Sequence, residues 1–465
     1  MTGISVFDHK LLADSWSTQD MRAVFCEENR VQKWLDVEAA LAKAQAKLNI
    51  IPQEAADEIA KKAYYKFMDM DFIFNEFKKT KHPLVPTVRG LEKACDNNLG
   101  EYVHFGVTTQ DIIDTGLVLQ FKEAMTLVKS ELKAIAKALV KLAKTHKNTA
   151  MMGRTLALQA LPITFGHKVA IWLSELERHF ERILELEKRL YVGSIVGAVG
   201  TKASLSDECN EVEKLTLENL GLDVPNISWQ SARDRFIELG FVLGNINATF
   251  NKIAHEILIL SHNEIDEVAE PFGKGQVGSS TMPHKRNPAV SENAVTVSNA
   301  FKANLAILSD IERHEHERDG QVWKMEWKLL PEMFLMLSVV LANMKFALSD
   351  LEVKKDKMLK NLDTLKGFVL AERVMFTLSD HYGKQHAHEI VYENAMLGIE
   401  KQKTFKEVLL ADKRVSKVLK EKEIDALLDA TTYVGYAPKL VDEFLEKIKN
   451  SAILKYEKRC YIAKF

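Results

Sequence analysis

The residues best suited to chemistry lie in one short stretch, 278–288, which reads Gly-Ser-Ser-Thr-Met-Pro-His-Lys-Arg-Asn-Pro. It combines serine hydroxyls with a cation and an amide two residues apart, Lys285 and Asn287. Pro283 and Pro288 keep the stretch out of a helix, and a glycine-led loop can point backbone N–H groups at an anion. The pattern predicts a loop that closes over a carboxylate-bearing ligand while a serine faces the reacting carbon. A polar surface loop is the alternative, and the length of the pattern argues against it.

A second polar stretch, residues 102–115, stands just before a long apolar helix pattern. It reads Tyr-Val-His-Phe-Gly-Val-Thr-Thr-Gln-Asp-Ile-Ile-Asp-Thr. Thr108, Thr109 and Asp111 could simply cap the helix, because threonine and aspartate satisfy unpaired N–H groups there. A helix N-terminus also attracts anions. The two threonine hydroxyls are therefore candidate ligands for a substrate carboxylate.

Metal and cofactor signals are weak in this sequence. His314, His316 and Glu317 are close enough together to suggest a metal, but no third ligand motif accompanies them. The sequence contains no glycine-rich nucleotide-binding motif. We therefore expect neither a metal nor another cofactor.

The loop at 278–288 resembles the signature of the fumarase/aspartase superfamily, which includes adenylosuccinate lyase, argininosuccinate lyase and 3-carboxy-cis,cis-muconate cycloisomerase. The resemblance continues at 102–115, where the superfamily carries Thr-Ser-x-Asp. It also includes 151–166, which reads Met-Met-Gly-Arg-Thr-Leu-Ala-Leu-Gln-Ala-Leu-Pro-Ile-Thr-Phe-Gly. Because it extends over nearly the whole chain, it implies an all-α, three-domain fold with a long central helical bundle. It further implies a homotetramer with a twenty-helix core and active sites shared between subunits.

The same resemblance assigns roles to individual residues. Ser279 matches the family's base, which removes a proton from the carbon beside a carboxylate. Lys285 and the loop amides would lower the pKa of that serine and stabilise the charge that forms on the carboxylate. The resemblance implies substrate contacts from Thr108, Thr109, Gln159, Ser280, Met282, Asn287, His82, His104 and Arg318. A structural role is the alternative for each of the two histidines.

Several departures from the family pattern concern the substrate. Fumarases and adenylosuccinate lyases place a histidine directly after Arg-Thr in the block at 151–166, and this chain has Leu156, which cannot transfer a proton. Other positions that help adenylosuccinate lyases hold their nucleotide are occupied by Ser15, Trp16, Trp229 and Trp327. These changes remove hydrogen-bond donors and cations that phosphate recognition needs. At these positions the chain is more similar to the muconate cycloisomerase branch.

Long helices must position these residues. Apolar residues recur in steps of three and four from Val118 to Leu142, and again from Phe236 to Leu260. The stretch 329–351 is apolar nearly all round, so it must be buried on every side. Oligomerisation satisfies that requirement more easily than one subunit can, and a monomer with a thick core is the alternative. With no comparable series of alternating strands, the sequence predicts an all-α bundle.

Three regions follow along the chain. We expect an N-terminal helical domain over 1–110, with shorter helices broken at prolines that include Pro83 and Pro86. Residues 111–355 form the central long-helix domain that carries the signature loop. Residues 356–465 form a C-terminal helical cap, which is rich in lysine.

Composition limits the partners. Lys and Arg number 63 against 65 Asp and Glu, a balance that argues against nucleic acid as a partner. The N-terminus is too polar for a signal peptide, and we see no apolar run of membrane-spanning length. Four scattered cysteines suit a reducing compartment. We expect a cytoplasmic protein that acts on a small di- or tricarboxylate, with neither nucleic acid nor membrane as partner.

Three functions remain open. The first is a lyase that releases fumarate from a succinyl or aspartate-derived substrate by β-elimination, with C–N cleavage expected, as in adenylosuccinate lyase. The second is a cycloisomerase that joins a carboxylate to a muconate double bond, which Leu156 and Trp229 favour. The third is a non-catalytic scaffold, which the intact Ser279, Lys285 and Asn287 argue against. We expect fumarate release, because it is the superfamily's commoner outcome.

Overall fold

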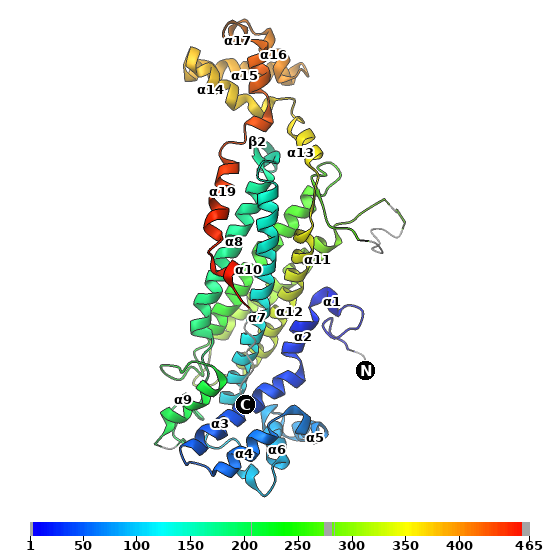
Figure 1. Ribbon diagram of the computed structural model, residues 1–465. Helices are drawn as coiled ribbons and strands as arrows, with labels where there is room; N and C mark the ends of the chain where they lie inside the picture. Colours follow the sequence, from blue (N-terminus) through cyan, green and yellow to red (C-terminus); the bar gives the residue numbers. More distant parts are fainter. Residues whose placement is uncertain (1–2, 206, 274–280, 283, 458–465) are drawn as a thin grey trace.

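The computed structural model describes residues 3–205, 207–273, 281–282 and 284–457. It is a long helical rod with a small group of helices at each end (Figure 1). Helices make up 69% of it, which confirms the predicted helical fold. Strands are confined to two short antiparallel pairs, β1 (Ala150–Thr155) with β2 (Leu158–Thr164), and β3 (Val268–Ala269) with β4 (Glu352–Val353).

The shaft of the rod is built from long helices. They are α7 (Thr109–Thr145), α8 (Phe165–Leu190), α10 (Asp234–Leu260), α11 (Ala289–Leu308) and α12 (Gly320–Ser349). Three of them, α7, α10 and α12, cover the apolar patterns read from the sequence. The aromatic ring of Phe121 on α7 lies 5.3 Å from that of Phe236 on α10 and 5.7 Å from that of Phe334 on α12. These contacts join the three helices at one level of the core.

Helix α12 differs from two expectations drawn from the sequence, which concern its burial and its length. Its residues from Leu329 to Leu341 are buried almost completely within a single chain. One chain therefore buries 329–341 without a second subunit, whereas Phe346, further along the same apolar stretch, is 42% exposed. The helix is also long and apolar enough to cross a membrane, contrary to the sequence reading, but 72% of its most apolar window is buried inside the protein. Such burial is typical of a core helix.

The N-terminal end of the rod contains shorter helices. They are α1 (Ala13–Trp16), α2 (Gln19–Phe25), α3 (Glu27–Lys47), α4 (Gln53–Lys62), α5 (Met70–Thr80) and α6 (Leu84–Ala94), and α9 (Cys209–Leu220) packs on α3. Pro86 lies inside α6 rather than at a break. It is the third residue of that helix, where a backbone N–H has no partner within the helix.

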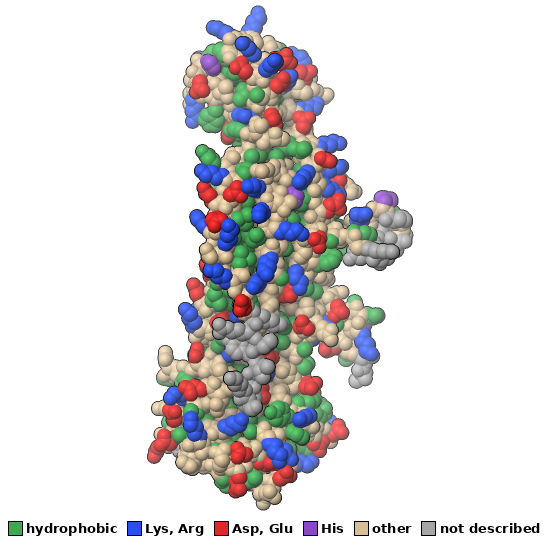
Figure 2. Space-filling view, in the orientation of Figure 1, with side chains coloured by type: hydrophobic (Ala, Val, Ile, Leu, Met, Phe, Trp, Pro, Cys, Tyr) green, Lys and Arg blue, Asp and Glu red, His purple; other side chains and the backbone are tan. Residues whose placement is uncertain are grey.

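The opposite end carries a small cap with its own apolar core. Its helices are α14 (Ala371–Tyr382), α15 (Lys384–Glu400), α16 (Phe405–Ala411), α17 (Lys413–Val418) and α18 (Glu421–Leu427), and α13 (Lys355–Leu362) packs on β1 below them. The chain then returns along the shaft, where α19 (Ala437–Ile448) and α20 (Ala452–Lys455) pack on α7 and α8. Acidic and basic side chains are interspersed over the visible face of the rod (Figure 2).

Candidate active site

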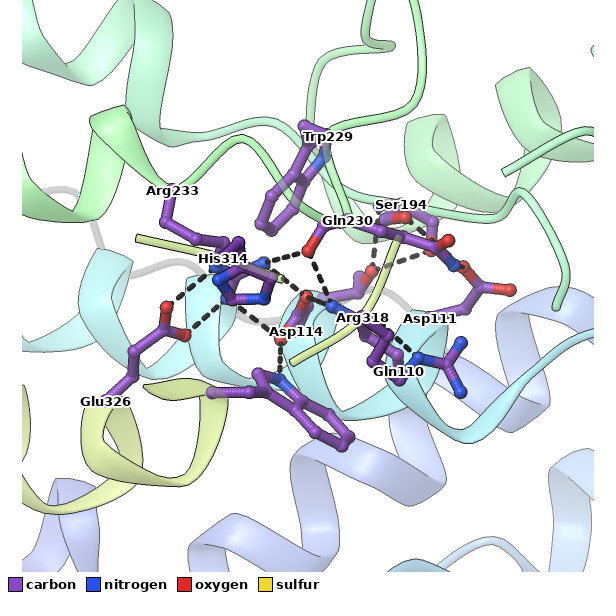
Figure 3. Close-up of polar contacts among 12 residues, drawn as sticks. Gln110, Asp111, Asp114, Ser194, Trp229, Gln230, Arg233, His314, Arg318 and Glu326 are labelled. Carbon is purple, nitrogen blue, oxygen red and sulfur yellow. Dashed lines mark hydrogen bonds and ion pairs between the residues drawn. The ribbon is translucent and has the colours of Figure 1, made fainter. Parts of the chain in front are cut away.

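Four of the expected substrate-binding residues gather at the N-terminal end of α7, and we call them the threonine cluster: His82, His104, Thr108 and Arg318. Arg318 comes just before α12, and its Nη2 donates to Thr108 Oγ1 at 3.1 Å. Its Nε donates to Gln110 Oε1 at 2.7 Å (Figure 3). Because Thr108 Oγ1 accepts from Arg318, its own proton is available to donate to a ligand.

A buried carboxylate holds the start of α7 in place. Asp111 accepts hydrogen bonds from the backbone N–H groups of Thr108 (3.1 Å), Val196 (3.1 Å) and Gly197 (2.9 Å). Gly197 has a φ of 78°, a left-handed conformation that suits glycine. Burial raises the pKa of Asp111 to about 6, against the lowering effect of these hydrogen bonds. Asp111 thereby ties the helix to the loop that also receives Arg318.

The threonine cluster has an excess of positive charge. Burial lowers the pKa of His82, and the nearby charges of Lys324, Arg318 and His104 lower it further. Among the described residues, no acidic side chain forms an ion pair with Lys324 or Arg318. The cluster can therefore bind an anion. Thr109, the first residue of α7, is half-buried beside it.

Sequence reasoning missed the buried ion triad behind this cluster. Arg233 pairs with Asp114 (Nη1–Oδ2, 2.7 Å) and with Glu326 (Nε–Oε1, 2.7 Å), and all three side chains are fully buried (Figure 3). Trp323 Nε1 also donates to Asp114 at 2.8 Å. Trp229 lies in the core, with the Arg233 guanidinium 5.0 Å from its ring centre. The sequence did contain a signal for this triad, because Asp114 and Glu326 are charged residues inside apolar helix patterns.

Gln159 lies elsewhere, on strand β2 near the cap. Its Nε2 donates to Asn361 O on α13 at 3.4 Å, and its Oε1 is buried with no hydrogen-bond partner among the described residues. The hairpin is held by Arg154, whose guanidinium donates to both carboxylate oxygens of Glu267 at 2.8 and 3.0 Å. Leu156 is 98% exposed at the tip of the same hairpin.

The signature loop joins β3 to α11. Ser279 and Ser280 lie outside the described residues, whereas Met282, Lys285 and Asn287 are described and exposed. Asn287 lines an open hollow of about 740 Å³ between β3 and the start of α11. Before the loop, Glu270 accepts from the N–H groups at the start of α11, Val290 at 3.1 Å and Ser291 at 2.6 Å.

One chain does not bring all the expected site residues together. Thr108 precedes α7, and the hairpin that carries Gln159 follows it. Because α7 has 37 residues, its ends are about 55 Å apart. Loop residues Lys285 and Asn287 also lie away from the threonine cluster, since α10 runs from the ion triad toward β3 (Figure 1). The structure thus places the threonine cluster at one end of the bundle and both Gln159 and the described loop residues away from it.

Comparison with known proteins identifies the family. The family model described as "Lyase" matches residues 15–301, and the model described as "Adenylosuccinate lyase C-terminus" matches residues 367–444. The N-acetyl-S-(2-succino)cysteine lyase of Enterococcus italicus is 43% identical over 453 residues, which cover 97% of this chain and 99% of that protein. The adenylosuccinate lyase of Methanocaldococcus jannaschii is 40% identical, over 94% of this chain and 95% of the relative.

A solved structure gives the same result. The 3-carboxy-cis,cis-muconate lactonizing enzyme from Pseudomonas putida superposes with a TM-score of 0.89 at 32% identity, over 94% of this chain and 99% of that one. The chain therefore belongs to the fumarase/aspartase superfamily of lyases, in the branch that contains adenylosuccinate lyases and 3-carboxy-cis,cis-muconate cycloisomerases.

Proposed function

We propose that this lyase cleaves a carbon–sulfur bond, releasing fumarate from an S-(2-succino) thiol such as N-acetyl-S-(2-succino)cysteine. The base removes a proton from the carbon next to one succinyl carboxylate. A carbon–carbon double bond then forms, and the bond to sulfur breaks with its electron pair on the leaving thiolate. The 43% identity to an N-acetyl-S-(2-succino)cysteine lyase over nearly the full length of both chains supports this choice.

Leu156 is the observation that carries the proposal. It occupies the place where fumarases and adenylosuccinate lyases have a proton-donating histidine, and it projects from the hairpin tip with 98% of its surface exposed. An amine that is uncharged in the bound substrate must gain a proton as it leaves, whereas a thiol has a pKa of about 8.5 and can leave as an anion. A site without an acid at this position therefore suits sulfur better than nitrogen.

The charge of the threonine cluster suits the same substrate. N-acetyl-S-(2-succino)cysteine carries three carboxylates, two on the succinyl part and one on the leaving part. Arg318 and Lys324 offer cations that no acidic side chain neutralises within the described part of the chain, and Thr108 offers a hydroxyl proton. We assign carboxylate binding to this cluster and to Thr109, with Gln159, Ser280, Met282 and Asn287 completing the site.

Proton abstraction is assigned to Ser279. Lys285 and the loop amides would lower the pKa of that hydroxyl and stabilise the doubly charged carboxylate of the intermediate. These roles follow the family pattern.

We further propose that each site is assembled from more than one copy of the chain, in a homotetramer. The distance between the threonine cluster and Gln159 supports this proposal, because antiparallel packing of two shafts would bring opposite ends together. Exposed apolar side chains on the shaft also support it, among them Ile171, Phe241 and Phe346, which are 49%, 50% and 42% exposed.

Carbon–nitrogen cleavage is the second candidate. The 40% identity to an archaeal adenylosuccinate lyase favours it. Ser15 and Trp16 count against adenylosuccinate itself, because they stand where that enzyme's nucleotide-holding Arg-Tyr pair is expected.

The test is fumarate formation from a panel of substrates. Purified protein is incubated with N-acetyl-S-(2-succino)cysteine, adenylosuccinate and 3-carboxy-cis,cis-muconate, and the products are followed by proton NMR. We expect fumarate and free N-acetylcysteine from the first substrate, and a loss of at least about a thousandfold in kcat for Ser279→Ala. Ser309→Ala, a change at an exposed serine of the shaft, serves as the control. Turnover of only adenylosuccinate or only the muconate would overturn the proposal.

A further inference from the structure

Glu38 contacts the threonine cluster through His104, and the proposed function gives it no role. It lies on α3, 66 positions before His104 in the sequence, and is 3% exposed. Its Oε1 lies 2.7 Å from His104 Nδ1, and its Oε2 accepts from the His104 backbone N–H at 3.1 Å. One carboxylate therefore holds both the ring and the backbone of His104, which has a left-handed φ of 61°.

This contact fixes the proton on the imidazole ring. An ionised carboxylate only accepts hydrogen bonds, so Nδ1 must carry the proton. Nε2 has no hydrogen-bond partner among the described residues, and the His104 side chain is 18% exposed. The second ring nitrogen is therefore the one that a ligand can reach.

Charged groups from several elements face His104. Glu38 approaches from α3 and Asp111 from α7, while His82 stands before α6. Arg318 and Lys324, at the start of α12, add positive charge to the same region. Burial alone would lower the pKa of His104, but the charge and hydrogen bond of Glu38, together with Asp111, raise it above the ordinary value.

We propose that Glu38 is a positioning residue that holds His104 as an imidazolium, so that Nε2–H donates to an anionic group of the substrate. The identity of that group as a carboxylate rests on the proposed function. The Glu38–His104 pair is preformed, since Glu38 fixes a proton on Nδ1 and favours the doubly protonated ring before any ligand binds.

The first test separates binding from turnover. Glu38→Gln keeps the shape and one acceptor but removes the charge. Because a hydrogen bond to a charged group is worth about 1.5–3 kcal/mol, we expect KM at pH 7 to rise about tenfold or more, with kcat within about twofold of wild type. The fall of kcat/KM with rising pH should move to lower pH, because His104 then loses its proton earlier.

Glu58→Gln is the matched control. Glu58 is also nearly buried in the N-terminal region and accepts a backbone N–H, that of Asp96, at 3.1 Å, but its ion pairs are with Lys61 and Lys62, and it contacts no histidine in the described part of the chain. Its exchange should leave KM and the pH profile unchanged. A KM for Glu38→Gln equal to that of wild type would overturn the inference.

A second test does not depend on activity. Histidines carrying ¹³C at Cε1 are titrated by NMR, and the His104 signal is assigned by its loss in His104→Gln. We expect a His104 pKa above the ordinary 6.5 in wild type and below it in Glu38→Gln. An unchanged pKa contradicts the inference even if no tested substrate reacts, whereas a shifted pKa without turnover would count against the proposed function alone. If Glu38→Gln does not fold, His104→Gln should itself raise KM about tenfold, and an unaltered KM there refutes the role.

Discussion

Buried charge surrounds the N-terminal end of α7, and its components can be tested one residue at a time. Arg233, Asp114 and Glu326 form an ion triad in which each group is paired and none is exposed. Removing one partner of such a pair leaves an uncompensated charge in the core. The triad also fixes the helix turn that follows Thr108, so its integrity matters for the site as well as for stability.

Arg233→Met should destabilise the protein strongly. Methionine keeps much of the apolar stem but removes the one cation of the triad, which leaves the buried carboxylates of Asp114 and Glu326 unpaired, so we expect the free energy of unfolding to fall by about 3–5 kcal/mol. Urea unfolding at fixed protein concentration measures this difference. Asp442→Asn, which breaks an exposed pair with Lys147, should cost less than about 1 kcal/mol. Equal losses for the two variants would contradict the importance of the triad.

His179 on α8 should make stability depend on pH. Burial, with help from Arg182, lowers its pKa to about 4, and its Nε2 lies 2.8 Å from Thr249 Oγ1. The unfolded chain binds a proton near pH 6.5 and the folded chain does not until about pH 4. Stability is therefore complete above pH 6.5 and falls by about 2–3 kcal/mol as the pH drops toward 4. Thermal unfolding of His179→Gln should show a flatter dependence, while the exposed-site control His381→Gln should match wild type.

The sequence predicted several site residues, but not the buried residues that hold them in place. Thr108 and Arg318 were found because they stand in recognisable local motifs, and the structure shows them in contact. Glu38 and Glu326 were missed because their partners lie 66 and 93 positions away. No local pattern reports such a pairing. The catalytic role of Ser279 stays a prediction, because that residue lies outside the described part of the chain.

At the scale of elements, the β1–β2 hairpin shows the clearest conflict between sequence and local structure. Thr155 and Leu158 pair across a two-residue loop, in which Leu156 and Ala157 have φ values of 50° and 69°. Such a turn favours Asn-Gly, and ordinary residues there are strained by about 1 kcal/mol each. The shared site proposed above would account for a strained tip that exposes a leucine.

Replacing the tip should therefore stabilise the chain and weaken the enzyme. For the double change Leu156→Asn with Ala157→Gly, we expect a gain of about 1 kcal/mol in the free energy of unfolding. We also expect a loss of activity, because the tip no longer presents its apolar surface to the proposed shared site. Chemical denaturation and fumarate release measure the two effects. A variant that gains stability at full activity would show that the tip has no role in the site.

Helix prediction succeeded for two regular apolar stripes but did not single out α8, whose buried side chains are spaced as regularly. The stripes of α7 and α10 were read from their three-and-four spacing, and both helices contain the expected residues. Helix α11 was missed because its sequence is rich in alanine, serine and asparagine, so only packing against α10 and α12 shows which face is buried. The β1–β2 hairpin was missed because its short apolar run has no clear period.

At the scale of the whole molecule, the separation of the two groups of site residues has a direct consequence. If sites are shared, two different inactive variants can complement each other. Thr108→Val disables the group at the start of α7, and Lys285→Met disables the loop group. A mixed tetramer would contain some sites in which both groups are intact.

We expect each variant to be inactive alone and the mixture to regain activity after subunit exchange in mild denaturant. Light scattering should give each species about four times the chain mass of 52.7 kDa. Mixing Thr108→Val with a second variant of the same group, Arg318→Met, is the control and should restore nothing. Exchange between tetramers without any recovered activity would contradict shared sites.

The most direct test of the proposed function compares two substrates that differ only at the leaving atom. N-acetyl-S-(2-succino)cysteine is paired with the analogue in which an NH group replaces the sulfur, and kcat/KM for fumarate release is measured for both at a pH above the pKa of that secondary amine. Because the amine is then uncharged and Leu156 cannot protonate it, we predict that the sulfur substrate reacts at least about a hundredfold faster, the usual contribution of a general acid. Equal values, or faster release from nitrogen, would contradict the assignment as a carbon–sulfur lyase.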